Sequence, residues 1–180
     1  MSSTRRAAIA GATVLCVVAV IVVMLRSSAA DSVSSVRRAP RFVAWTVDSL
    51  PTERSLDDYA GYPLLLNVWA TWCDPCREEM PSMDRLYRDY RDRGLRVVAV
   101  SIDEAGNESL IREFVGDHGL TFDILHDAKS DIMSLYGVLG VPQTFLISRR
   151  GEIVANRFAA DWSSAESRAL VDSLLRIGAP

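Results

Sequence analysis

Cysteine and histidine are scarce in this chain of 180 residues, which has three cysteines and two histidines. A structural zinc site needs four ligands at characteristic spacings. Beyond Cys73 and Cys76 only His118 and His126 are obvious ligands for zinc, and neither stands at such a spacing. The sequence therefore argues against a metal site, and we expect both histidines to be ordinary surface or loop residues.

Lysine is almost absent, since Lys129 is the only lysine among the 20 basic residues. Three arginines lie in the first 26 residues, which contain no acidic residue, so the rest of the chain has 17 basic and 23 acidic side chains and a net charge of −6. Proteins that bind nucleic acids usually carry a basic stripe. The sequence has none after residue 26, so it gives no reason to expect a nucleic acid as partner.

One long apolar run is present, at residues 7–25, and it contains no charged residue. Its 19 residues are enough to cross roughly 30 Å of hydrocarbon as a helix. A cleaved signal peptide is the alternative, but its apolar region is usually only about 7–15 residues long, and Arg26 separates this run from the small residues that cleavage needs. Arginines on both sides of the run leave its orientation open.

These features divide the chain into three parts. We expect residues 1–26 to be a membrane anchor, or else a signal peptide, with Cys16 a small apolar residue inside it. Residues 27–40 are small, polar and basic, which is typical of a flexible stalk. Residues 41–180 are long enough for one folded domain.

Strands and helices alternate along the folded part. Residues 64–70 and 95–103 are nearly continuous apolar runs, as expected of strands covered on both faces. Apolar residues at helical spacing follow each run. Farther along, residues 121–125 predict a short strand and residues 130–136 a short helix. Residues 143–158 predict a hairpin, and residues 163–177 a final helix. This order predicts an α/β domain whose parallel sheet has an antiparallel extension.

Two cysteines stand where the first of these strands meets a helix, in the motif "WCDPC" at residues 72–76. Pro75 suits the first helical turn, and the free N–H groups and dipole there favour a thiolate at Cys73. Cys76 is close enough to capture the same sulfur. The pair is therefore suited to attack a substrate disulfide with Cys73 and to resolve the mixed disulfide with Cys76. An inert structural disulfide is the alternative.

Glu79 is the most informative carboxylate of the helix. It shares an apolar stripe with Met83 and Leu86, at positions i, i+4 and i+7. A carboxyl group on an apolar face should have a raised pKa, which suits a proton donor and acceptor for the thiols. The alternative is an edge residue that reaches water.

The motif "WCDPC" after a buried strand, "GVPQTFLI" farther along, "CREEMP" and the apolar N-terminal run together resemble the thioredoxin superfamily. The chain is most similar to its membrane-anchored, extracytoplasmic branch, the TlpA/ResA/CcmG-like thiol–disulfide oxidoreductases. The resemblance implies a thioredoxin-like fold with a central mixed sheet flanked by helices, placed outside the cytoplasmic membrane. Cytosolic thiols are already kept reduced, which supports the same placement.

The resemblance also implies partners. Members of this branch reduce selected protein disulfides, often those of apocytochrome c before haem attachment. A membrane thiol protein that carries electrons across the bilayer reduces them again. The chemistry of a dithiol needs no organic cofactor and no metal.

Further site residues follow from the resemblance. Members carry a functional Glu three residues after the second cysteine, where Glu79 stands, and a cis peptide bond before the proline that matches Pro142. Such a bond would lay the backbone of Val141 beside Cys73, where an extended substrate can pair with it. Classical thioredoxin has a buried Asp at the place of Asn67, so proton handling would fall to Glu79 or to water.

Other residues near the motif have weaker signals. Trp72 is expected to shield Cys73 and to offer contact area, with simple core packing as the alternative. Asp103 and Glu104 follow the second strand, and we expect them to be solvated loop residues. Asp74 disfavours a thiolate at Cys73, which predicts a reducing rather than an oxidising pair.

Two rival functions share this fold. A peroxidase needs a proline and a hydroxyl residue at set positions before its cysteine, and Thr71 alone does not supply that pattern. A non-catalytic metallochaperone or adaptor is the other rival. Metal chaperones of this fold usually separate their cysteines by three residues, whereas two residues separate Cys73 from Cys76.

Overall fold

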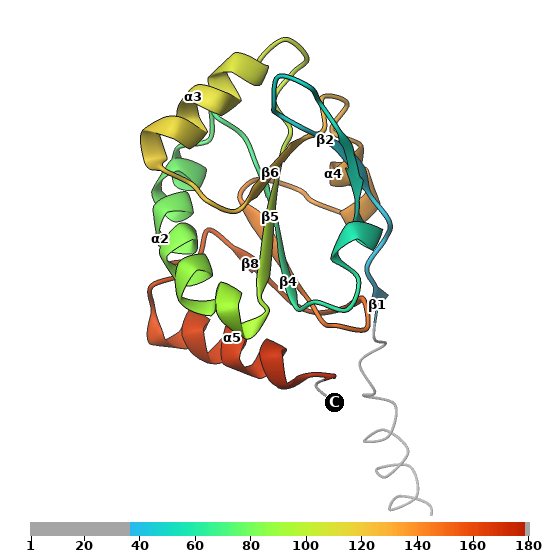
Figure 1. Ribbon diagram of the computed structural model, residues 1–180, viewed down its shortest axis with the longest axis vertical. Coiled ribbons are helices and arrows are strands. Elements are labelled where there is room, and N and C mark those ends of the chain that lie inside the picture. The colour runs from blue at the N-terminus through green and yellow to red at the C-terminus, as the bar shows by residue number, and fades with distance from the viewer. Residues whose placement is uncertain (1–36, 179–180) are drawn as a thin grey trace, which may run out of the picture. The chain divides into compact units, whose positions relative to one another are not determined.

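The computed structural model in Figure 1 describes residues 37–178. Its centre is an eight-stranded mixed sheet with the strand order β1-β8-β7-β4-β5-β6-β2-β3. In chain order the elements are β1 (Arg37–Arg38), β2 (Val43–Thr46), β3 (Glu53–Ser55), η1 (Leu56–Tyr59), β4 (Leu64–Trp69), α2 (Asp74–Tyr90), η2 (Arg91–Arg93), β5 (Arg96–Ser101), α3 (Glu108–His118), β6 (Asp123–His126), α4 (Asp131–Tyr136), β7 (Gln143–Ile147), β8 (Glu152–Phe158) and α5 (Ala165–Arg176). The predicted thioredoxin-like α/β fold, a mixed sheet flanked by helices, is confirmed.

The two apolar runs form the centre of this sheet. β4 and β5 pair in parallel from Leu64 opposite Arg96 to Trp69 opposite Ser101, and every residue of β4 is buried. β6 pairs in parallel with β5, while β7 runs antiparallel to β4. Helices cover both faces of these strands, which explains why their sequences are apolar at nearly every position.

Hydrophobic clusters occupy the two faces of the sheet. Successive strand residues point to opposite faces, so Leu65 joins a cluster with residues of α2, α3 and α5. Leu64 and Leu66 join a second cluster with residues of α4. Figure 1 shows α2, α3 and α5 on one side of the sheet and α4 on the other.

The first strands of the domain were not predicted, because all are short: β1 and β3 are polar, and β2 has only three apolar residues, Val43–Trp45. β2 and β3 form an antiparallel pair at one edge of the sheet. At the other edge, β1 pairs with β8, with Arg37 opposite Ile153. Arg37 and Arg38, which lie within the expected stalk, are therefore held against the sheet.

The expected membrane anchor lies outside the described residues. Within residues 37–178, no helix combines the length and apolar character that crossing a bilayer requires.

Candidate active site

The two cysteines form a disulfide across the first turn of α2. Cys73 is the N-cap residue, with an extended backbone, and its Sγ accepts a hydrogen bond from the backbone N–H of Cys76 at 3.2 Å. Pro75 lies in the first turn, as predicted. Cys73 is 4% exposed and Cys76 is 0% exposed. Cys73 is therefore the one of the two that a substrate can approach, and an N–H group already points at its sulfur.

The carboxylate of Glu79 is buried one turn farther along α2, with the residue only 5% exposed. Four donors surround it. Oε1 accepts hydrogen bonds from Trp162 Nε1 at 2.7 Å, Thr144 Oγ1 at 3.2 Å and Asn67 Nδ2 at 3.3 Å, and Oε2 accepts one from the N–H of Ala160 at 3.2 Å. The predicted position on the buried stripe is confirmed, and the alternative of an edge residue in water is wrong.

Burial raises the pKa of Glu79 above its ordinary value, and the hydrogen bonds from Trp162, Thr144 and Ala160 oppose that rise. The direction agrees with the prediction from the sequence. A raised pKa lets a carboxyl group exchange its proton more readily at neutral pH than an exposed glutamate does. It can therefore take up and release a proton near the cysteines.

Three of the four donors were missed from the sequence. Thr144 comes from β7, and Ala160 and Trp162 from the segment between β8 and α5, 65 to 83 residues from Glu79 in the chain. Asn67, noted only as the replacement for the buried Asp of classical thioredoxin, donates to Glu79 and also to Thr144 Oγ1 at 2.9 Å. No local pattern marks these residues, because only the packing of β4, β7 and α2 brings them together.

Asp103 corrects another expectation, since it is 1% exposed rather than solvated. Its carboxylate accepts hydrogen bonds from the N–H of Thr71 at 3.0 Å, from Thr71 Oγ1 at 2.6 Å and from Ser101 Oγ at 2.6 Å. Glu104 is exposed, as expected. Asp103 thus holds the loop between β4 and Cys73 in place from the end of the neighbouring strand.

The histidines also differ from expectation. His126 is buried at the end of β6, where its Nε2 lies 2.8 Å from the carbonyl oxygen of Asp103. His118 is half-buried and stacks on Phe114 at 4.1 Å between ring centroids. Within residues 37–178, no group of three or more His, Cys, Asp or Glu residues is arranged to hold a metal ion.

The peptide bond between Val141 and Pro142 is cis, as predicted. It precedes β7, whose first residue Gln143 pairs with Val68 of β4. Continuing this antiparallel register places Val141 and Pro142 beside residues 69–70, just before the cysteine loop. Val141 remains partly exposed.

Trp72 is 66% exposed, so the alternative of core packing is wrong. A groove beside it is lined by Thr71, Arg77, Leu110 and Phe114, among others. The guanidinium of Arg77 lies 5.5 Å from the centroid of the Phe114 ring. The side chain of Trp72 therefore offers apolar contact area next to Cys73.

Comparisons with known proteins agree with this arrangement. The model of the AhpC/TSA family matches residues 36–156. The thiol-disulfide oxidoreductase ResA of Oceanobacillus iheyensis is 43% identical over 98 residues, which are 54% of this chain and 50% of the relative. The thioredoxin-like protein YneN of Bacillus subtilis is 42% identical over 118 residues, 65% of this chain and 67% of the relative. The chain thus spans about half to two thirds of the length of these curated relatives.

A solved structure from Chlorobium tepidum shares the fold. It is the structure of a protein provisionally assigned as thiol:disulfide interchange protein DsbE, and it superposes on this chain with a TM-score of 0.67 at 29% identity. The match covers 79% of this chain and 99% of that protein. The resemblance stated from the sequence motifs is therefore confirmed.

Proposed function

The chain belongs to the AhpC/TSA family, and we propose that it is a thiol–disulfide oxidoreductase that reduces protein disulfides through Cys73 and Cys76. The observation that carries this proposal is the disulfide across the first turn of α2, at the carboxyl end of β4. Functional groups collect at this edge of α/β sheets. The names of the relatives ResA and DsbE support the same activity.

The reaction begins with the reduced pair. The Cys73 thiolate attacks one sulfur of a substrate disulfide, so that a bond between Cys73 and that sulfur forms and the other substrate sulfur leaves as a thiolate, which takes up a proton. Cys76 then loses its proton and attacks the sulfur of Cys73. The second substrate sulfur leaves, the Cys73–Cys76 disulfide forms, and two electrons have passed to the substrate.

Glu79 serves as the proton relay for this second step. It lies three residues after Cys76 on the same buried face of α2, and burial raises its pKa. A carboxylate whose pKa is raised by burial is a stronger base than an exposed one, and it takes the proton of Cys76 more readily than water does. Asn67 occupies the neighbouring place but cannot titrate, which leaves Glu79 as the titratable group of this network.

The substrate is held at Trp72, Val141 and Pro142. Val141 lies just before β7, next to the cysteine loop, and its backbone is suited to pair with an extended peptide as an added strand. Trp72 contributes exposed apolar area. Such a platform recognises the backbone of the substrate more than its side chains, so it can bind several disulfide-bearing proteins.

Residues 1–26 tether the domain to the membrane, and the domain acts on its extracytoplasmic side. The substrates there include apocytochrome c, and a membrane thiol protein supplies the electrons. Asp74 beside Cys73 makes the pair reducing, because it opposes the thiolate. A measured potential near the roughly −120 mV of DsbA would contradict this direction.

Trapping tests the reaction. The reduced full chain with Cys76→Ser should accumulate a mixed disulfide with oxidised insulin, because Cys76 no longer resolves it. The variant Cys73→Ser should form none, while the unchanged chain should release reduced insulin. Equal trapping by both variants, or no reduction by the unchanged chain, would refute the roles of the attacking and the resolving cysteine.

Two rivals give different results in the same experiments. A peroxidase would consume hydrogen peroxide at substantial rates with the purified chain. An adaptor or metallochaperone would keep its cellular function when Cys73 is replaced by Ser, whereas a reductase would lose it.

A further inference from the structure

A second pocket lies at the end of the sheet opposite the cysteines. It is formed by the turn between β7 and β8, the segment before β4 and the residues after β1. Cys73 follows the other end of β4, and six residues of a strand span roughly 20 Å. The pocket is therefore separate from the active site.

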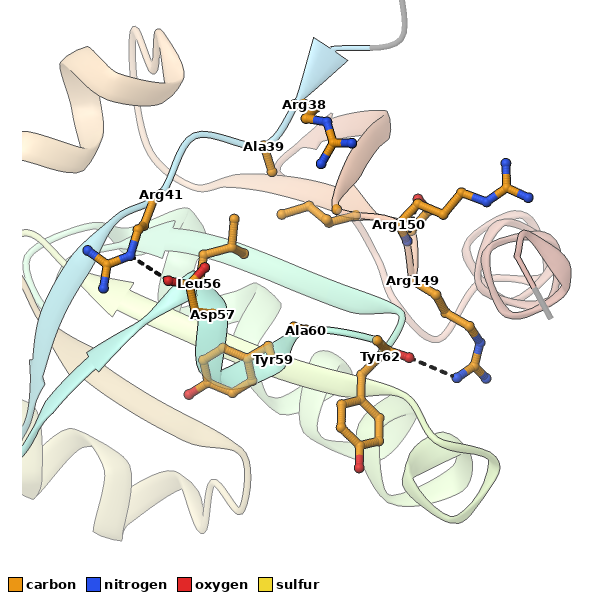
Figure 2. Close-up of a pocket in the computed structure, with 14 residues that line it drawn as sticks. Arg38, Ala39, Arg41, Leu56, Asp57, Tyr59, Ala60, Tyr62, Arg149 and Arg150 are labelled. Carbon is orange, nitrogen blue, oxygen red and sulfur yellow. Dashed lines mark hydrogen bonds and ion pairs between the residues drawn. The ribbon is translucent and has the colours of Figure 1, made fainter. Parts of the chain in front are cut away.

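Four arginines line this pocket, and we call it the arginine pocket. Arg38 comes from β1, Arg41 follows it, and Arg149 and Arg150 form the turn between β7 and β8. Figure 2 shows Arg41 on one side of the pocket and Arg149 and Arg150 on the other, with Ala39 and Leu56 between them. The lining thus has an apolar floor of residues such as Ala39 and Leu56, and it includes Asp57. The side chains of Arg149 and Arg150 extend outward from the pocket's edge.

Most of this positive charge has no acidic partner. Arg41 pairs with Asp57 at 2.6 Å. In the described part of the chain no carboxylate lies within ion-pair distance of Arg38, Arg149 or Arg150. Arg149 donates to the carbonyl of Gly61 at 3.2 Å, and its Nε is buried without a hydrogen-bond partner.

Such a cluster is unexpected in an acidic domain, since residues 27–180 have a net charge of −6. A surface on which several arginines without acidic partners gather attracts anions. Phosphate oxygens match the fork of donors on a guanidinium. The arginine pocket is therefore suited to phosphate groups attached to an apolar surface.

The order of the chain indicates where that surface is. Arg37 follows Arg26 by eleven residues, which reach at most roughly 40 Å when fully extended. Arg26 ends the apolar run that we expect to enter the membrane. Basic residues close to a bilayer are attracted by anionic lipids, and each strengthens binding by about fivefold.

We propose that the arginine pocket binds the phosphate headgroups of anionic phospholipids. The domain then lies on the bilayer with the turn between β7 and β8 toward the lipid, and Cys73 faces away from the membrane, where soluble substrates reach it. This proposal does not depend on which side of the membrane the domain occupies, because all the arginines of the pocket follow the apolar run in the chain.

The test uses the full chain in lipid nanodiscs of zwitterionic phosphatidylcholine, with and without anionic phosphatidylglycerol. Hydrogen exchange is measured in residues 37–41 and 147–151. Anionic lipid should slow exchange in both segments by roughly tenfold or more at low salt, and high salt should reverse the effect. Exchange in α2 should not change.

A triple variant identifies the residues responsible. Replacing Arg38, Arg149 and Arg150 by Gln should abolish the lipid-dependent protection. The matched control replaces Arg85, Arg112 and Arg157 by Gln, which removes the same charge from α2, α3 and β8 and should keep the protection. Unchanged exchange in β4 shows that each variant is folded.

Three outcomes would overturn the proposal. Exchange could be equal on both kinds of nanodisc, which means that anionic lipid does not bind. The control variant could lose as much protection as the pocket variant, which means that only net charge matters. Free glycerol phosphate could protect the segments on zwitterionic discs when anionic lipid does not, which means that the pocket takes a soluble anion.

Discussion

The hydrogen bond from Trp162 to Glu79 allows a quantitative test of the buried network. Trp162 is fully buried, and its Nε1–H donates to Glu79 Oε1 at 2.7 Å. The variant Trp162→Phe removes this donor but keeps an aromatic ring in the core. The carboxylate then loses its shortest hydrogen bond while it remains buried.

The expected shift follows from the strength of that bond. A hydrogen bond to a charged group contributes about 1.5–3 kcal/mol, and one pKa unit corresponds to about 1.4 kcal/mol. The pKa of Glu79, already raised by burial, should therefore rise by about one to two further units. The lower end is expected because Thr144 and Asn67 donate to the same oxygen.

Carbon NMR of the side-chain carboxyl measures this pKa, with the Glu79→Gln spectrum identifying the signal. The matched control is Trp72→Phe, which changes an exposed tryptophan outside the network and should leave the pKa of Glu79 where it is. Chemical denaturation of Trp162→Phe, Glu79→Gln and the double variant adds a second measure. Because Gln at position 79 can still accept a hydrogen bond, the coupling free energy between the two substitutions should be about 1 kcal/mol. This is the difference between a hydrogen bond to a charged acceptor and one to a neutral acceptor.

An unchanged pKa in Trp162→Phe would refute the reasoning. It would mean that the indole N–H does not stabilise the carboxylate, and that the other donors or water fully replace it. A shift of equal size in Trp72→Phe would also contradict it, because the effect would not be specific to the hydrogen bond.

Three further predictions concern stability. Asp103→Ala should lower the free energy of unfolding by about 2–4 kcal/mol, because it leaves the buried hydroxyl of Ser101 and two half-buried donors of Thr71 without their acceptor. Exposed Glu104→Ala should change it by less than about 0.5 kcal/mol, and urea denaturation measures both. Leu66→Ala should cost about 2–5 kcal/mol in the same assay, because it opens a cavity in a fully buried strand, and a smaller cost would mean that the second cluster is loosely packed. Because the folded pKa of Glu79 is raised, its contribution is fully present below the ordinary glutamate pKa and is lost as pH rises through the folded value. Relative to Glu79→Gln, the unchanged chain should therefore lose stability from acidic toward neutral pH, and parallel pH profiles would contradict the raised pKa.

Local patterns of the sequence predicted the central elements well. The apolar runs became β4 and β5 because a strand covered on both faces must be apolar at every position. The cysteine motif predicted its own geometry, since a strand end, a proline in the first turn and three-residue spacing are all local. By contrast, β2 and β3 were missed because they are only four and three residues long and partly exposed, which is too short for a clear pattern.

The surroundings of the site were harder to predict. Asp103 looked like a loop residue because acidic residues after a strand are usually solvated. Packing of the loop before Cys73 against it supplies two of its donors, and Ser101 supplies the third. Glu79 was identified from its place on an apolar stripe. Its donors were not, because periodicity along one helix says nothing about which distant segment packs against it.

The sequence by itself determined the strand–cysteine–helix unit, the spacing of the two thiols and the place of Glu79 on an apolar stripe, since each depends on neighbours within a few residues. Only the tertiary structure decided which groups bind that carboxylate, what fixes the loop before Cys73, and that arginines far apart in the chain share one pocket. The physical reason is that hydrogen bonds and charge interactions act over a few ångströms in space. Strand pairing and helix packing set those distances between residues that the chain itself keeps far apart.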